Sequence, residues 1–161
     1  MQENKFEFNY TVYKSSDELP QPLQELLSKA RAVTEQAYAP YSNFQVGAVA
    51  RLANGELVSG SNQENASFPA GLCAERVLLA SAASQFPRVP INTLAVSYKS
   101  EQHNSDHPIS PCGICRQSLQ EYENRMNQPV QLVLGGLTGP VYVIGSASRL
   151  LPLAFTREEL R

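Results

Sequence analysis

Cysteine is scarce in this chain of 161 residues: there are only three, and an odd number argues against the disulfide framework of a small secreted domain. No apolar run approaches the ~18 residues that a membrane-spanning helix requires. Lysine and arginine are scattered singly and the net charge is −2, so the basic stripe typical of nucleic-acid binders is missing. These absences predict that neither nucleic acid nor a membrane is a partner.

The N-terminal sequence also lacks the features of a signal peptide. Residues 1–5 lead into a mixed polar and aromatic stretch, with no charged region followed by an apolar run. Free thiols persist most easily in a reducing compartment. We therefore expect a cytoplasmic protein, with 42% hydrophobic residues that suffice for one buried core.

Hydrophobic periodicity predicts alternating helices and strands. Helices are expected at residues 22–38, 73–84 and 112–126, and strands at 44–52, 56–61, 91–98, 130–134 and 141–144, with Asn54-Gly55 as a hairpin turn. The pattern favours an α/β fold, a three-layer α/β/α sandwich around one five-stranded mixed sheet. Only residues 135–140 join the last two strands, so these strands must be antiparallel if they are neighbours.

Residues 1–14 read as an N-terminal extension in front of a single domain, residues 15–161. Phe6, Phe8, Tyr10 and Val12 alternate with other residues, which is typical of a strand. The pattern fits either an added strand or an arm at an interface, and both remain open at this point.

All three cysteines fall within two short motifs, Cys73-Ala74-Glu75-Arg76 and Pro111-Cys112-Gly113-Ile114-Cys115. Three thiolates supply three zinc ligands and leave the fourth tetrahedral position to water, as a catalytic zinc requires. Glu75 is a carboxylate that could transfer protons beside that water. Both motifs begin predicted helices, where the positive end of the helix dipole favours the thiolate.

Simpler readings compete with a catalytic zinc. His103 or His107 could close the site as a fourth, structural ligand, although both lie in a polar run and most resemble solvated residues. Glu75 could be only a favourable first-turn carboxylate.

The motifs also resemble those of a known family. A ligand-x-Glu motif followed by Pro-Cys-x-x-Cys is the signature of zinc nucleobase deaminases. Further matching segments occur in the family's order, at residues 39–44, 46–48, 60–66, 110–117 and 150–155. The chain thus resembles the small, all-cysteine, homotetrameric cytidine deaminases. The resemblance implies a cytidine deaminase-like fold, Zn²⁺ as cofactor, a homotetramer and hydrolytic deamination of cytidine and 2′-deoxycytidine in pyrimidine salvage.

The resemblance also implies roles for single residues. Hydroxide formed on zinc attacks C4 of cytosine, Glu75 moves protons from the water to N3 and to the departing amino group, and Arg76 donates to the ligand sulfurs. The residues implied in metal and substrate binding are Cys73, Cys112 and Cys115 for zinc, Phe44 and Ala74 for the base, Asn62 and Glu64 for the ribose, and Phe155 for a neighbouring subunit's site.

Each substrate role has a structural alternative. Asn62 and Glu64 could be turn residues, Phe44 a core residue, Phe155 an interface cover, and Arg76 a plain surface residue. Two other functions also remain open. One is a deaminase of another cytosine nucleoside, such as an antibiotic of the blasticidin kind, and the other is a non-enzymatic, zinc-stabilised binding domain.

Overall fold

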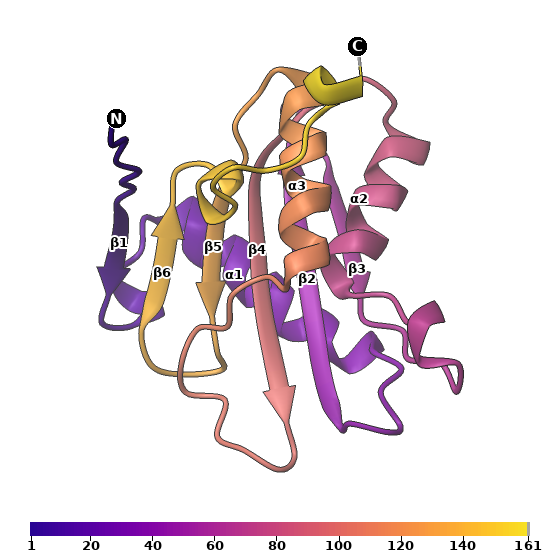
Figure 1. Ribbon diagram of the computed structural model, residues 1–161. Helices are drawn as coiled ribbons and strands as arrows, with labels where there is room; N and C mark the ends of the chain where they lie inside the picture. Colours follow the sequence, from indigo (N-terminus) through magenta and orange to yellow (C-terminus); the bar gives the residue numbers. More distant parts are fainter. Residues whose placement is uncertain (161) are drawn as a thin grey trace.

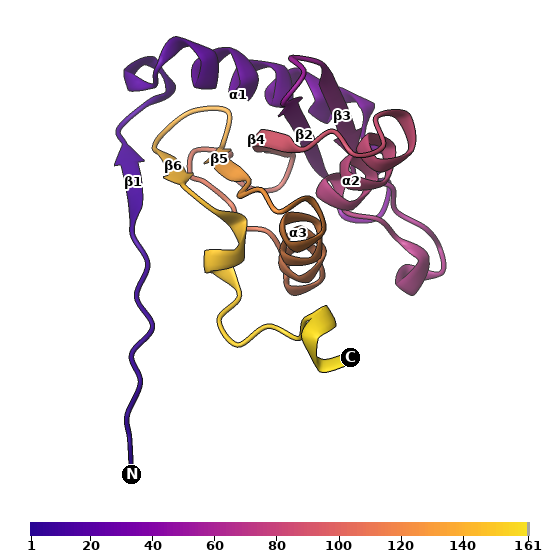
Figure 2. The ribbon, with the colours of Figure 1, turned by 90° about the horizontal axis from the view of Figure 1, so that it is seen from above.

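The protein folds as a six-stranded mixed sheet covered by helices on both faces (Figure 1). The computed structural model describes residues 1–160. Helix α1 covers one face, and α2 and α3 cover the other (Figure 2), so the predicted α/β/α sandwich is confirmed. The strand order is β1-β6-β5-β4-β2-β3, and the bounds are β1 (Tyr10–Tyr13), β2 (Phe44–Leu52), β3 (Leu57–Ser61), β4 (Ile91–Ser100), β5 (Gln131–Gly135) and β6 (Val141–Ile144).

The sheet contains one strand more than the five that the sequence predicted. The added strand is β1, which pairs antiparallel with β6 and places Tyr10 opposite Ile144. The ring centroids of Tyr10 and Tyr142 lie 5.0 Å apart across this pair. Of the alternating residues near the N-terminus, Tyr10 and Val12 therefore form a strand, whereas Phe6 and Phe8 lie in residues 1–9, which extend away from the body of the molecule (Figure 2).

The remaining strand pairs complete the single sheet. The β5–β6 pair is antiparallel, as its short connection required, and the β2–β3 and β2–β4 pairs are antiparallel as well. The β4–β5 pair is parallel, so its connection must cross over the sheet, and α3 (Gly113–Met126) forms that crossover. The second cysteine motif lies at the start of this crossover helix.

Helix α1 (Gln21–Val33) is shorter than the predicted helix of residues 22–38. A 3₁₀ turn, Thr34–Gln36, follows it, and the Thr34 hydroxyl donates a 2.7 Å hydrogen bond to the Arg31 carbonyl. Threonine hydroxyls compete for backbone groups in this way and favour helix ends. The buried side of α1 consists of Leu26, Leu27, Ala30 and Val33.

Helix α2 (Ala74–Gln85) lies unusually close to β3, and Gly60 makes this possible. A Cβ atom at Gly60 would lie 2.5 Å from the Ala74 carbonyl oxygen and 2.5 Å from the Leu78 nitrogen. The first turn of α2 is therefore fixed against the sheet, and the first cysteine motif with it. Within residues 1–160, every helix is too short or too polar to cross a membrane.

Candidate metal centre and active site

Three thiols from two helix N-termini meet at one point. Cys73 is the N-cap residue of α2, Cys112 is the N-cap residue of α3, and Cys115 lies in the first turn of α3. The Sγ atoms of Cys73 and Cys112 are 3.7 Å apart, and those of Cys112 and Cys115 are 3.5 Å apart. A tetrahedral zinc with Zn–S bonds of about 2.3 Å requires sulfurs about 3.8 Å apart, so the three thiols fit one zinc ion.

The thiols also influence one another's ionisation. A hydrogen bond from Cys115, with smaller contributions from Cys112 and the positive charge of Arg76, lowers the pKa of Cys73 to about 6 although burial opposes the shift. The same hydrogen bond, together with burial and the charges of Glu75 and Cys73, raises the pKa of Cys115. Cys73 therefore ionises more readily than Cys115, and a divalent cation among the sulfurs would favour the thiolate at all three.

Glu75 is a buried carboxylate beside the thiols, with 5% of its surface exposed. Burial is the main cause that raises its pKa, and the negative charge of Cys73 adds to it. A carboxyl group that holds a proton more readily than usual suits the exchange of protons near neutral pH.

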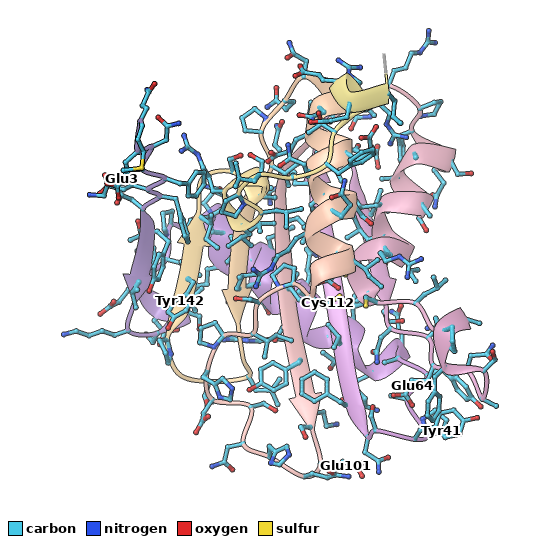
Figure 3. The ribbon with its side chains drawn as sticks, in the orientation of Figure 1. Glu3, Tyr41, Glu64, Glu101, Cys112 and Tyr142 are labelled. Atoms are coloured by element: carbon cyan, nitrogen blue, oxygen red, sulfur yellow. The ribbon has the colours of Figure 1, made fainter. Side chains whose placement is uncertain are left out.

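A cavity of about 740 Å³ opens in front of the thiols and Glu75. In Figure 3, Cys112 lies where α3 begins, and Glu64 and Tyr41 lie in the loops below and to the right of it. The walls of the cavity come from the start of β2, the segment after β3, the first turn of α2 and the segment before α3. The predicted site residues that line it are Phe44, Asn62, Glu64, Cys73, Ala74, Glu75 and Cys112.

Asn62 joins the end of β3 to β2 through its side chain. Its Nδ2 donates to the Phe44 carbonyl at 2.8 Å, and its Oδ1 accepts from the Val46 N–H at 2.7 Å. The amide thus continues the strand pairing one step beyond the ladder and fixes the segment that carries Phe44. One amide hydrogen is left over to donate to a ligand.

Glu64 is held by the loop that precedes β2. Its carboxylate accepts hydrogen bonds from the Tyr41 N–H at 2.8 Å, from the Ser42 N–H at 3.3 Å and from the Ser42 hydroxyl. Partial burial acts to raise its pKa, but these hydrogen bonds outweigh burial and lower it below the usual range. The side chain is therefore ionised and fixed at the cavity wall.

Three predicted site residues do not line this cavity: Cys115, which is fully buried, Arg76 and Phe155. Arg76 is half-buried, and its charge acts on Cys73 without a hydrogen bond to a ligand sulfur within residues 1–160. Phe155 is 59% exposed, and only its carbonyl, which accepts from Gln117 Nε2 at 2.8 Å, is tied to α3. Their roles toward the sulfurs and toward a neighbouring subunit stay predictions.

Similarity to known proteins agrees with this geometry. The family model described as "Cytidine and deoxycytidylate deaminase zinc-binding region" matches residues 20–128. The chain belongs to this deaminase family. Because the matched region is the family's zinc-binding region and three thiols converge here, zinc is the cofactor that the site holds.

Individual relatives match over most of their length. A cytidine deaminase from Halalkalibacterium halodurans is 37% identical over 137 residues, which is 85% of this chain and 96% of that protein. The crystal structure of cytidine deaminase from Burkholderia pseudomallei matches with a TM-score of 0.71 at 41% identity and covers 81% of this chain and 97% of that one. Cytidine deaminase from Mycobacterium tuberculosis matches with a TM-score of 0.62 at 29% identity, over 81% of this chain and 94% of that one.

One residue beside the site has a structural role that no motif predicted. Arg116 donates from Nε to the Pro111 carbonyl at 2.8 Å and from Nη1 to the Leu150 carbonyl at 3.1 Å. It therefore fixes the residue before Cys112 and ties that residue to the C-terminal part of the chain. Its place directly after Cys115 was a signal that it serves the metal motif.

The histidine alternative finds no support in this geometry. Among the described residues, the potential metal ligands that cluster are the three cysteines alone. His107 instead lies 3.2 Å from the Tyr98 hydroxyl and 3.1 Å from Asp106. A closed structural site with His107 as fourth ligand would require this side chain to leave Tyr98 and Asp106.

Proposed function

We propose that this protein catalyses the hydrolytic deamination of cytidine and 2′-deoxycytidine to uridine and 2′-deoxyuridine, with release of ammonia, in pyrimidine salvage. The proposal is carried by one observation: three thiols and a buried carboxylate converge on a single cavity in a chain of this family. Relatives from two bacteria with crystal structures carry the name cytidine deaminase.

Cys73, Cys112 and Cys115 would hold the zinc ion, which when bound supplies Lewis-acid activation of a water molecule. Glu75 takes a proton from the attacking water and delivers it to N3 of the pyrimidine. As the C4–N bond breaks, Glu75 takes the second proton of that water from the oxygen now bound to C4 and passes it to the departing amino group, which leaves ammonia and a C4 carbonyl. Its burial and raised pKa support both directions of this transfer.

The cavity walls suit a nucleoside. The Phe44 ring would offer an apolar face to the base, and Ala74 also lines the cavity. Asn62 has one amide hydrogen to donate and Glu64 is an ionised acceptor, so together they can bind ribose hydroxyls as donor and acceptor. Arg76 would offset the negative charge of three thiolates around the zinc.

The proposal extends to the assembly and its surroundings. We propose a homotetramer in which Phe155 reaches a neighbouring site, supported by the exposure of its ring. A reducing, cytoplasmic environment is supported by three free thiols. We also retain residues 15–161 as the deaminase domain and residues 1–14 as its extension.

The test compares the protein with its Glu75→Gln variant. Wild-type protein mixed with cytidine should lose the cytidine absorbance band and release ammonia, whereas Glu75→Gln should keep zinc and fold but lose roughly 10²–10⁴-fold in turnover. A variant that retained more than about a tenth of the activity would remove Glu75 from the mechanism. Blasticidin in the same assay separates a nucleoside deaminase from an antibiotic deaminase, and turnover of neither compound would favour a zinc-stabilised binding domain.

A further inference from the structure

Tyr98 lies directly behind the aromatic wall of the cavity. Its side chain is 1% exposed, and it does not line the cavity itself. Its ring stacks on the ring of Phe44 with centroids 5.0 Å apart and planes 19° from parallel. Phe44 therefore both lines the cavity and stacks on Tyr98.

The hydroxyl of Tyr98 binds the loop that follows β4. It donates to the Asn104 carbonyl at 3.3 Å and lies 3.2 Å from Nδ1 and 3.3 Å from Nε2 of His107. The His107 ring meets the Tyr98 ring edge-on, at 5.7 Å and 65°. Two residues after His107, the same loop supplies Ile109 and Ser110 to the cavity wall.

Hydrogen bonds and close packing hold this loop in place. The Ser105 hydroxyl accepts from the Ser100 N–H at 3.0 Å, and its carbonyl accepts from the Thr138 N–H at 3.2 Å. Gly139 has a φ of +78°, and a Cβ atom there would lie 1.9 Å from the Asp106 carbonyl oxygen. Only glycine therefore lets the β5–β6 turn pack this closely against the loop.

We propose that Tyr98 is a positioning residue that clamps two walls of the substrate cavity: its ring orients Phe44, and its hydroxyl holds the loop that leads to Ile109 and Ser110. The inference rests on the proposed nucleoside deaminase function. By this proposal, the polar loop of residues 100–108 sets the width of the base pocket from behind Phe44. Tyr98 does not line the cavity, so we expect it to affect substrate binding more than the chemical step.

Three variants separate the two halves of the clamp. Tyr98→Leu removes the ring behind Phe44 and should raise the KM for cytidine roughly three- to tenfold, with kcat nearly unchanged, since a stacked aromatic pair contributes about 0.5–1.5 kcal/mol. Tyr98→Phe keeps the ring and removes the hydroxyl, so it should raise KM less. Tyr98→Phe combined with His107→Ala should raise KM by less than the product of the two single changes, because both variants remove the contact between the Tyr98 hydroxyl and His107.

Tyr122 provides the matched control. It is 3% exposed, and its hydroxyl donates to the Val89 carbonyl at 3.2 Å, away from the cavity. Tyr122→Phe should lower the unfolding midpoint about as much as Tyr98→Phe while leaving KM at the wild-type value. If KM changed equally in Tyr98→Phe and Tyr122→Phe, Tyr98 would act only as a core residue.

Two further measurements test the route of the effect. In a Phe44→Ala background, Tyr98→Leu should add little to KM; a full additional effect would show that Tyr98 does not act through Phe44. Hydrogen exchange at residues 100–108 should be faster in Tyr98→Phe than in wild type or Tyr122→Phe. Unchanged exchange at these residues would overturn the clamp, whether or not the wild-type protein turns over cytidine. Failure of the wild-type protein to turn over cytidine would by itself refute only the proposed function.

Discussion

The carboxylate of Glu123 accepts a 2.8 Å hydrogen bond from the main-chain N–H of Ala147. The same buried carboxylate accepts from the Val130 N–H at 2.7 Å and from the Ser148 N–H at 3.1 Å. These bonds attach α3 to the 3₁₀ turn Ala147–Leu150, whose last carbonyl accepts from Arg116. The zinc motif on α3 is therefore braced from the C-terminal part of the chain.

Replacing Glu123 by alanine should destabilise the fold strongly. The change leaves several buried N–H groups without an acceptor, and hydrogen bonds to charged groups contribute about 1.5–3 kcal/mol each, so we expect a loss of roughly 2–4 kcal/mol in the free energy of unfolding. Urea unfolding measures it. Glu121→Ala on the exposed side of α3 is the control and should change stability by less than about 0.5 kcal/mol.

The zinc ion should need no histidine. The double variant His103→Ala/His107→Ala should retain one zinc per chain, because the described ligand cluster consists of thiols. Metal analysis after gel filtration measures the content, with Cys112→Ala as the variant that should lose zinc. Loss of zinc from the histidine variant would establish the closed structural site instead.

Acid should weaken the contribution of Glu64. Its folded pKa is lowered, so its hydrogen bonds stabilise the fold above the unfolded pKa of about 4.3, and this stabilisation is lost as pH falls through the folded pKa. Ser42→Ala should therefore reduce the free energy of unfolding at pH 7, and the difference from wild type should shrink with acidification. In a Glu64→Gln background the Ser42→Ala effect should no longer depend on pH in this range.

Phe155 should act in a neighbouring chain. Phe155→Ala should weaken cytidine binding and leave zinc content intact, since a base stacked on an aromatic ring gains roughly 1–3 kcal/mol. Mixed oligomers of Phe155→Ala and Glu75→Gln chains, reassembled after dissociation, should regain part of the activity. Verified mixed oligomers without any recovery would place Phe155 in its own chain's site, or outside the site altogether.

Local patterns in the sequence predicted most of the fold. The strand β2 and the strand β6 have the predicted bounds, because alternation and the Asn54-Gly55 turn are local signals. The position of β1 could not be predicted, since its alternation says nothing about which edge it joins. At the early end of α1, a side-chain hydrogen bond from Thr34 competes with an otherwise helical pattern.

The same distinction between local signals and long-range contacts applies to the candidate site. The thiols and Glu75 were predictable because their spacing within each motif is itself the chemical signal. The contacts of Arg116 with Leu150 and of Tyr98 with His107 join segments whose proximity follows from the sheet order and the loop conformation. Side chains that act through such contacts leave no short motif in the sequence.

The crossover helix has a consequence for the order of folding. Cys73 precedes β4 and Cys112 follows it, 39 residues later, so the ligand set is complete only once β4 has joined the sheet and both helices have docked. Closing this loop costs conformational entropy before the native contacts that offset the cost have formed, so these contacts form late in folding. Zinc therefore binds an almost native chain, and raising its concentration should slow unfolding while leaving the refolding rate nearly unchanged.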